Sequence, residues 1–93
     1  MHRSHLLPQD VPHAEMIAAA AALVLAPAKG ETVLLLDVAH AISAEVRRSG
    51  GDSSAYHLGT VKRVLEEAGI RTRRAPDYIA GAVYLDGVRL LTV

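Results

Sequence analysis

The stretch SSAYHLGTVKRVLEEAG, residues 53–69, is the most informative part of this 93-residue chain. It predicts one helix over 54–68, because Asp52 or Ser53 can cap the first N–H groups and Gly69 suits a left-handed helix exit. Apolar side chains recur at helical spacing along one side of this helix, and we expect that side to face the core. These residues are Leu58, Val61, Leu65 and Ala68.

The opposite side of the same helix is polar. At about 100° per residue it turns hydroxyl and charged groups toward solvent, namely Tyr56, Thr60, Arg63 and Glu67. The next residues, 70–74, read IRTRR and predict a short, densely basic strand. After a loop over 75–81, Asp86-Gly87 lies between two apolar runs, which predicts a hairpin turn at that pair.

A first helix is expected near the amino end. It opens at Asp10 or at the Val11-Pro12 pair, includes the alanines at 18–22 and ends before Pro27. Its apolar run is far shorter than the roughly 20 residues that span a bilayer. A secretory signal core is the other interpretation, but acidic residues stand where such a segment needs basic ones. We therefore favour a buried core helix.

The middle of the chain predicts a second helix. Residues 30–36 fit a short strand, or equally the entry to that helix, since leucine-rich runs are ambiguous. Asp37 is expected to cap a helix over 38–48 that ends at Gly50-Gly51. The link to the next helix is then about four residues, short enough for a tight helix-turn-helix. The core-facing residues are predicted to be Val38, Ala39, Ile42 and Val46.

Composition and charge limit the class of protein. The chain is 51% apolar and 3% aromatic, which fits a small globular domain, and it has no cysteine for disulfides or thiolate metal sites. The net charge is zero, yet residues 47–74 hold seven basic residues against three acidic ones, whereas residues 1–46 hold two against five. Such a polarised distribution favours an anionic partner.

We expect neither catalysis nor a cofactor. The sequence shows no Ser/His/acid set and no Gly-rich phosphate loop, and adjacent Glu66 and Glu67 diverge around their helix. His2 and His5 lack a third ligand, so no metal site is expected. Residues 1–9 are predicted to be a flexible arm and residues 10–93 a single cytoplasmic domain without a membrane segment.

The predicted order is helix, short strand, helix, turn, helix, and then strand, loop and strand. Over about residues 11–85 it resembles the winged helix-turn-helix family. The stretch LEEAGIRTRR at 65–74, followed after a loop by GAVYL at 81–85, is similar to winged-helix segments of phage and plasmid replication proteins. The resemblance implies an α+β fold of three helices and a small antiparallel sheet whose wing is residues 70–85. The C-terminal hairpin at Asp86-Gly87 is an addition that a minimal winged helix does not need.

Double-stranded DNA is the partner that the resemblance implies, in transcriptional or replication control. The arginine-rich and alanine-rich composition fits a high-GC bacterium or one of its phages. Helix 54–68 would enter the major groove, where His57 either reaches the bases or packs beside Val64, and the basic strand would contact phosphates or the minor groove. The alternative is a protein-interaction module, either a homodimer through the Ala-rich first helix or a phage-encoded binder of a host protein. The expected DNA-contacting residues are Ser53, Ser54, Tyr56, His57, Thr60, Lys62, Arg63, Arg71, Arg73, Arg74 and Arg47.

Overall fold

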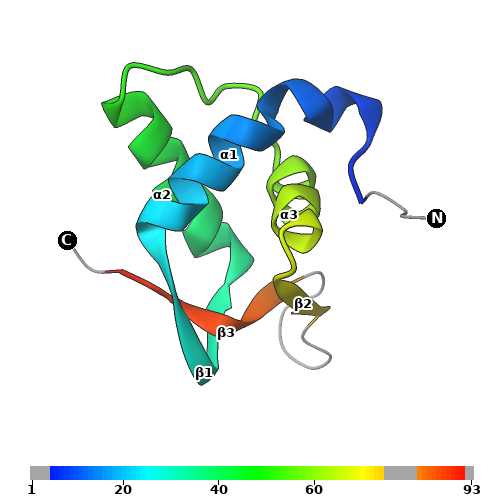
Figure 1. Ribbon diagram of the computed structural model, residues 1–93, viewed down its shortest axis with the longest axis vertical. Coiled ribbons are helices and arrows are strands. Elements are labelled where there is room, and N and C mark those ends of the chain that lie inside the picture. Colours follow the sequence, from blue (N-terminus) through cyan, green and yellow to red (C-terminus); the bar gives the residue numbers. More distant parts are fainter. Residues whose placement is uncertain (1–4, 75–81, 92–93) are drawn as a thin grey trace.

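The computed structural model describes residues 5–74 and 82–91, and these form three helices and a three-stranded antiparallel sheet (Figure 1). The sheet lies below the helices in that view, and α1 crosses over α2. The elements in chain order are the 3-10 turn η1 (Pro8–Asp10), α1 (Val11–Val24), β1 (Leu25–Leu34), α2 (Leu35–Arg48), α3 (Leu58–Glu67), β2 (Arg71–Arg74) and β3 (Val83–Leu90). The expected α+β class is confirmed.

β3 is the central strand of the sheet and pairs antiparallel with β1 on one side and β2 on the other. Leu85 of β3 pairs with Val33 of β1 and Thr72 of β2, and its side chain is fully buried. The connection 75–81, expected as the wing loop, lies outside the described residues. Both β1 and β2 are therefore edge strands of the described sheet.

The expected hairpin at Asp86-Gly87 is wrong, because β3 runs without interruption through both residues. Asp86 pairs in register with Thr32 of β1, and Val88 pairs with Pro27, so four residues of β1 bulge out opposite Gly87. Gly87 has φ +81°, a left-handed value that side chains other than glycine adopt only with strain. The Asp-Gly pair thus lies at a β-bulge in the pairing of β3 with β1, and the chain does not reverse direction there.

The core is aliphatic and is shared by all three helices and β3. The predicted stripe of α2 is confirmed, since Val38, Ala39, Ile42 and Val46 are all buried. The first helix is indeed a core helix, with Ile17 inaccessible to solvent. It ends at Val24, and Leu25 and Ala26 pair with β3 instead of continuing the helix.

The strand expected over 30–36 begins earlier and ends at Leu34, and the last two residues of that range open α2. Each interpretation of the leucine-rich run is therefore right for part of it. Asp37 is not the cap, because Leu34 occupies the N-cap position and Asp37 lies in the first turn. The glycine exits are confirmed: Gly50 after α2 and Gly69 after α3 both have positive φ.

The third helix is shorter than predicted. The Asp52 carboxylate accepts a hydrogen bond from the Ser54 N–H at 2.9 Å, and the Tyr56 N–H donates to the Ser53 carbonyl at 3.0 Å. These bonds satisfy backbone N–H groups within a turn, so the residues predicted to cap the helix form a loop instead. α3 begins only at Leu58. The interval between α2 and α3 is correspondingly longer than the predicted tight turn.

The buried side of α3 also differs from the prediction. Val61 and Leu65 are buried as expected, but Leu58 is 42% exposed and Ala68 is exposed. Val64 is buried in their place, and so is Thr60. The helix is therefore rotated about its own axis relative to the prediction. Thr60 lies on the buried side, where its hydroxyl is bonded to the Asp10 carboxylate of η1.

Candidate nucleic-acid interface

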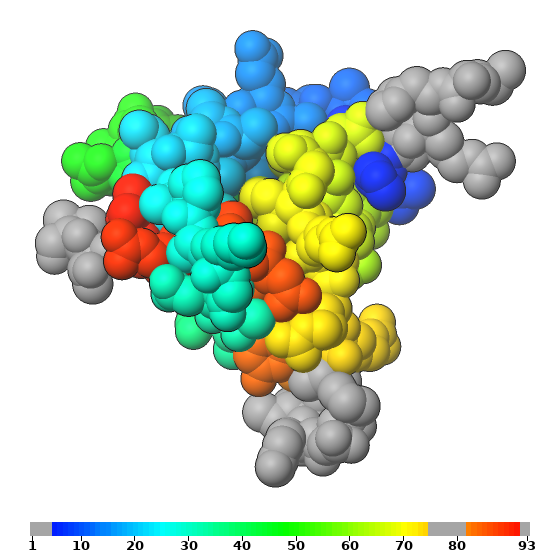
Figure 2. Space-filling model, turned by 60° about the horizontal axis from the view of Figure 1, so that its bottom comes forward, coloured from blue at the N-terminus to red at the C-terminus, as the bar shows by residue number. Residues whose placement is uncertain are grey.

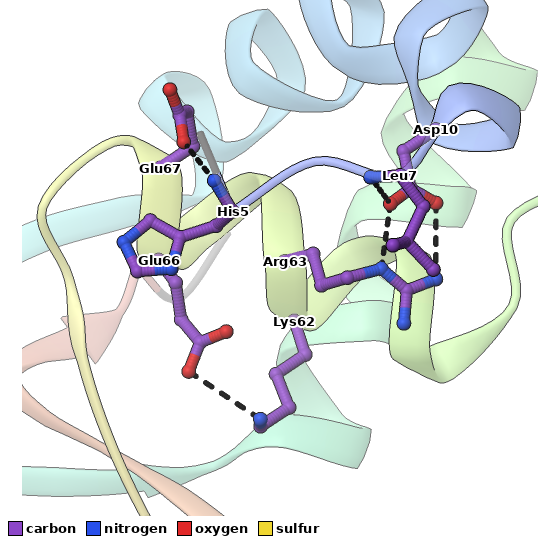
Figure 3. A network of polar contacts seen from close by, with 7 residues as sticks. All are labelled: His5, Leu7, Asp10, Lys62, Arg63, Glu66 and Glu67. Carbon is purple, nitrogen blue, oxygen red and sulfur yellow. Dashed lines mark hydrogen bonds and ion pairs between the residues drawn. The ribbon is translucent and has the colours of Figure 1, made fainter. Parts of the chain in front are cut away.

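Arg63 is held by an ion pair with Asp10, the residue that immediately precedes α1 (Figure 3). Its Nε lies 2.6 Å from Oδ2 of Asp10 and its Nη2 lies 3.0 Å from Oδ1, so both carboxylate oxygens are engaged. The Leu7 N–H also donates to Oδ2 at 2.9 Å. Asp10 is fully buried. The expectation that Arg63 points outward, ready for phosphate, is therefore wrong: its guanidinium joins the amino end of the fold to α3.

The charge state of this pair follows from its geometry. The hydrogen bond from Arg63 holds the pKa of the Asp10 carboxyl well below its usual range; burial opposes this effect, and the Leu7 N–H and the Thr60 hydroxyl add to it. The same pairing raises the pKa of Arg63. Both groups are thus ionised in the folded protein, and the sequence alone offers no sign that Asp10 is buried.

Thr60 and Tyr56 do not lie on the solvent side of the helix, contrary to the prediction. Thr60 is only 3% exposed and faces the Asp10 carboxylate. Tyr56 precedes α3, is half-buried against the core, and meets the His13 ring edge-on at 5.5 Å. Burial, followed by the nearby Asp52 charge, raises the pKa of the Tyr56 hydroxyl. Both residues consequently hold the loop and α1 together and leave little surface for a ligand.

A second polar cluster joins α3 to β2. Glu66 accepts a hydrogen bond from the Thr72 hydroxyl at 2.6 Å and pairs with the Lys62 ammonium at 3.4 Å. Burial opposes ionisation of Glu66, but Thr72 and Lys62 together lower the pKa of its carboxyl. His5 contributes a backbone N–H to the neighbouring Glu67 carboxylate at 2.7 Å. Lys62 therefore shares its charge with Glu66 (Figure 3), and Glu66 in turn is bonded to Thr72 of β2.

The arginines of β2 differ in their partners. Arg73 pairs with Asp86 at 3.2 Å and lies over the Tyr84 ring at 5.6 Å. Arg71 and Arg74 are exposed, and among the described residues neither has an acidic partner. Because side chains alternate along a strand, Arg71 and Arg73 project from one side and Thr72 and Arg74 from the other. The edge strand thus presents arginines on both of its sides.

The remaining predicted contact residues are scattered. Ser53 is half-buried, while Ser54 and His57 are exposed in the approach to α3. Arg47 is exposed near the end of α2 and donates from Nε to the Ser43 carbonyl at 3.4 Å. Lys62 therefore lies on α3 next to Glu66, and Arg71 and Arg74 lie on opposite sides of the strand that follows. Tyr56, Thr60 and Arg63 are engaged in contacts within the fold. Figure 2 shows α3 and β2, in yellow, as one continuous surface.

An apolar groove of about 280 Å³ opens beside this surface, between α1, β1, α3 and β3. Its walls include Ala18, Leu25, Leu65, Ile70 and Val88, and every lining residue is apolar. No helix of the part of the chain that the structure describes is long and apolar enough to cross a membrane. Comparison with protein-family models, with curated proteins and with solved structures finds no match.

Proposed function

We propose that the protein is a small DNA-binding domain of winged-helix type. The element order α1-β1-α2-α3-β2-β3, with β3 between β1 and β2, supports this assignment, because it puts a strand–loop–strand directly after the third helix. In this arrangement the amino end of α3 faces the major groove and the strands after it lie along the backbone.

The observation that carries the proposal is the edge strand β2. It follows α3 and offers two exposed guanidinium groups, on Arg71 and Arg74, without an acidic partner among the described residues. Unpaired surface arginines gain most from phosphate, since they give up no existing ion pair when they bind it. Arg73 keeps a partial role, because its pairing with Asp86 is exposed and easily exchanged.

The contacts with bases would come from the exposed approach to α3. Ser54 and His57 lie there, and Lys62 is one helical turn further along. Tyr56, Thr60 and Arg63 are left out of this proposal. Moving Thr60 or Arg63 toward DNA would break their buried contacts with Asp10, and moving Tyr56 would break its contact with the His13 ring. Gene control or replication control is the role that such a domain would serve.

Binding to duplex DNA across a salt series tests the proposal. The affinity should fall steeply with salt, and the double substitution Arg71→Ala/Arg74→Ala should reduce the slope of log K against log salt by roughly 0.9 for each phosphate that the variant no longer binds. Arg48→Ala is the matched control, because Arg48 is an exposed arginine on α2 that is bonded to Glu45. It should leave the slope unchanged.

Two outcomes would count against DNA binding. One is absent or salt-independent binding by the unmodified chain, which would favour the protein-interaction module instead. The other is an equal loss in the Arg48 variant and the β2 variant, which would mean that bulk charge and not β2 governs the affinity. Thermal unfolding of each variant checks that the fold is intact.

A further inference from the structure

The outer face of the sheet, which points away from the helices, carries polar and aromatic side chains. Leu85 marks the inner face, because it is fully buried and its ladder partner Thr72 is bonded to Glu66 of α3. Side chains alternate along a strand, so the residues next to Leu85 and Thr72 project to the other face. The residues that project there from β2 and this part of β3 are Arg71, Arg73, Tyr84 and Asp86.

The bulge opposite Gly87 adds a further arginine to this face. Strict alternation along β3 would turn Arg89 inward together with Leu85. The structure instead packs Val88 and Leu90 against the core, so the alternation shifts by one residue at the bulge. Arg89 consequently lies on the outer face, where it is exposed. The sheet platform, as we call these cationic and aromatic side chains, consists of Arg71, Arg73, Tyr84 and Arg89.

The sheet platform has a surplus of positive charge. Asp86 is the one acidic residue of β2 and β3, and its carboxylate pairs with Arg73 at 3.2 Å in an exposed ion pair. Three arginines therefore share one carboxylate. Neither Arg71 nor Arg89 has an acidic partner in the part of the chain that the structure describes. A surface with such a surplus attracts a polyanion.

Tyr84 gives the same surface an aromatic ring. The residue is half-buried, and the guanidinium carbon of Arg73 lies over the ring, 5.6 Å from its centroid. Nucleic-acid bases stack on aromatic rings and on guanidinium planes. In a duplex the faces of the bases are already stacked on one another, so only an unpaired strand offers a base to this ring. The ring therefore favours single-stranded over double-stranded nucleic acid as the polyanion.

We propose that single-stranded nucleic acid binds to the sheet platform. Its phosphates contact the three arginines, and one base stacks on Tyr84 beside the Arg73 guanidinium. The proposal goes beyond duplex binding by α3 and does not depend on it, because the platform lies on the face of the sheet that points away from that helix. Arg71 is common to both surfaces, whereas Tyr84 and Arg89 belong to the platform alone.

Fluorescence anisotropy with labelled strands of about 12 nucleotides tests the proposal. Oligo(dT) and oligo(U) should both bind, because neither base stacking nor phosphate contacts read the 2′-hydroxyl group. Arg89→Ala should reduce the slope of log K against log salt by roughly 0.7, the value for one phosphate of a single strand. Arg48→Ala is the matched control, since it removes the same charge from α2 and should leave the slope unchanged.

Two substitutions of Tyr84 test the role of its ring. Tyr84→Leu should weaken binding to oligo(dT) about tenfold, because the stacked base loses its partner, whereas Tyr84→Phe should bind like the unmodified chain. Neither substitution should change binding to a duplex of the same length. In a chain whose other two tyrosines are replaced by phenylalanine, oligo(dT) should also quench the Tyr84 fluorescence. Circular dichroism checks that each variant is folded.

Four outcomes would each overturn the proposal. The first is no binding of oligo(dT) at low salt, and the second is an equal loss in the Arg89 and Arg48 variants. The third is Tyr84 fluorescence that stays unquenched at saturating oligo(dT). The fourth is a polyglutamate peptide that binds as tightly as oligo(dT), since the platform would then recognise charge alone. Duplex binding that persists in any of these cases leaves the function proposed for α3 and β2 intact.

Discussion

Arg63 and Asp10 lie 53 positions apart in the sequence and form a two-pronged ion pair whose carboxylate is fully buried. The pair connects η1 and the start of α1 with the middle of α3. Leu7 and Thr60 supply further hydrogen bonds to the same carboxylate. Asp10 is thus the anchor that sets how α3 is rotated, and with it which of the helix residues reach the surface.

Removing the arginine should leave a buried, uncompensated charge. Arg63→Ala is expected to lower the free energy of unfolding by about 3 kcal/mol, since breaking one side of a buried pair costs about 3–5 kcal/mol and Arg63 is partly exposed. Arg48→Ala, which breaks the exposed pair with Glu45, should cost under about 1 kcal/mol. Urea unfolding measures both; equal losses would contradict an anchoring role for Asp10.

Acid should destabilise the fold through the same carboxylate. Because the folded pKa of Asp10 is lowered, its contribution is present above the unfolded value of about 3.9 and is lost as the pH falls below that value. The free energy of unfolding should therefore decline more steeply between about pH 5 and pH 2 in the unmodified chain than in Asp10→Asn. Urea titrations at each pH test this, and parallel curves would disprove it.

The rotation of α3 can be tested with two truncations. Val64→Ala removes buried side-chain atoms and should cost about 2 kcal/mol, from lost burial and the cavity left behind. Leu58→Ala should cost less than about 1 kcal/mol, since that leucine is 42% exposed. The amphipathic pattern of the sequence predicts the opposite order. Chemical unfolding of the two variants distinguishes these arrangements.

The bulged ladder depends on Gly87. Gly87→Ala should lower the free energy of unfolding by about 1–2 kcal/mol, because φ +81° brings an added Cβ close to the following carbonyl oxygen. Gly87→Asn should cost less, since asparagine tolerates the left-handed region better than alanine. Among the described residues, no atom within 4 Å would obstruct the Cβ, so the effect is conformational and not steric crowding. Equal stability of all three proteins would mean that the backbone at Gly87 relaxes.

Much of the fold could be predicted from local pattern. The stripe Val38, Ala39, Ile42 and Val46 depends only on helical periodicity and the glycine exit after it, and both are confirmed. The basic strand after Gly69 follows from its β-forming run, and it is found at Arg71–Arg74. These features are set within a few residues, where propensity and periodicity act directly.

The candidate site was less predictable. Its cluster of basic residues is visible in the sequence. Which of them are free to bind an anion depends on acidic residues far away in the sequence, because Asp10 forms an ion pair with Arg63 and Asp86 forms one with Arg73. The Asp86-Gly87 pair likewise looks like a hairpin turn until its ladder partners on β1 are known. No local rule could assign these partners.

The amino-acid sequence was sufficient for the number of helices, the aliphatic core and the basic character of the segment after α3, because each arises from short-range spacing and composition. The rotation of α3, the course of β3 and the partners of the arginines follow only from tertiary contacts. The physical reason is that a buried carboxylate must be paired, and this requirement outweighs the preference of a short helix for its most amphipathic orientation.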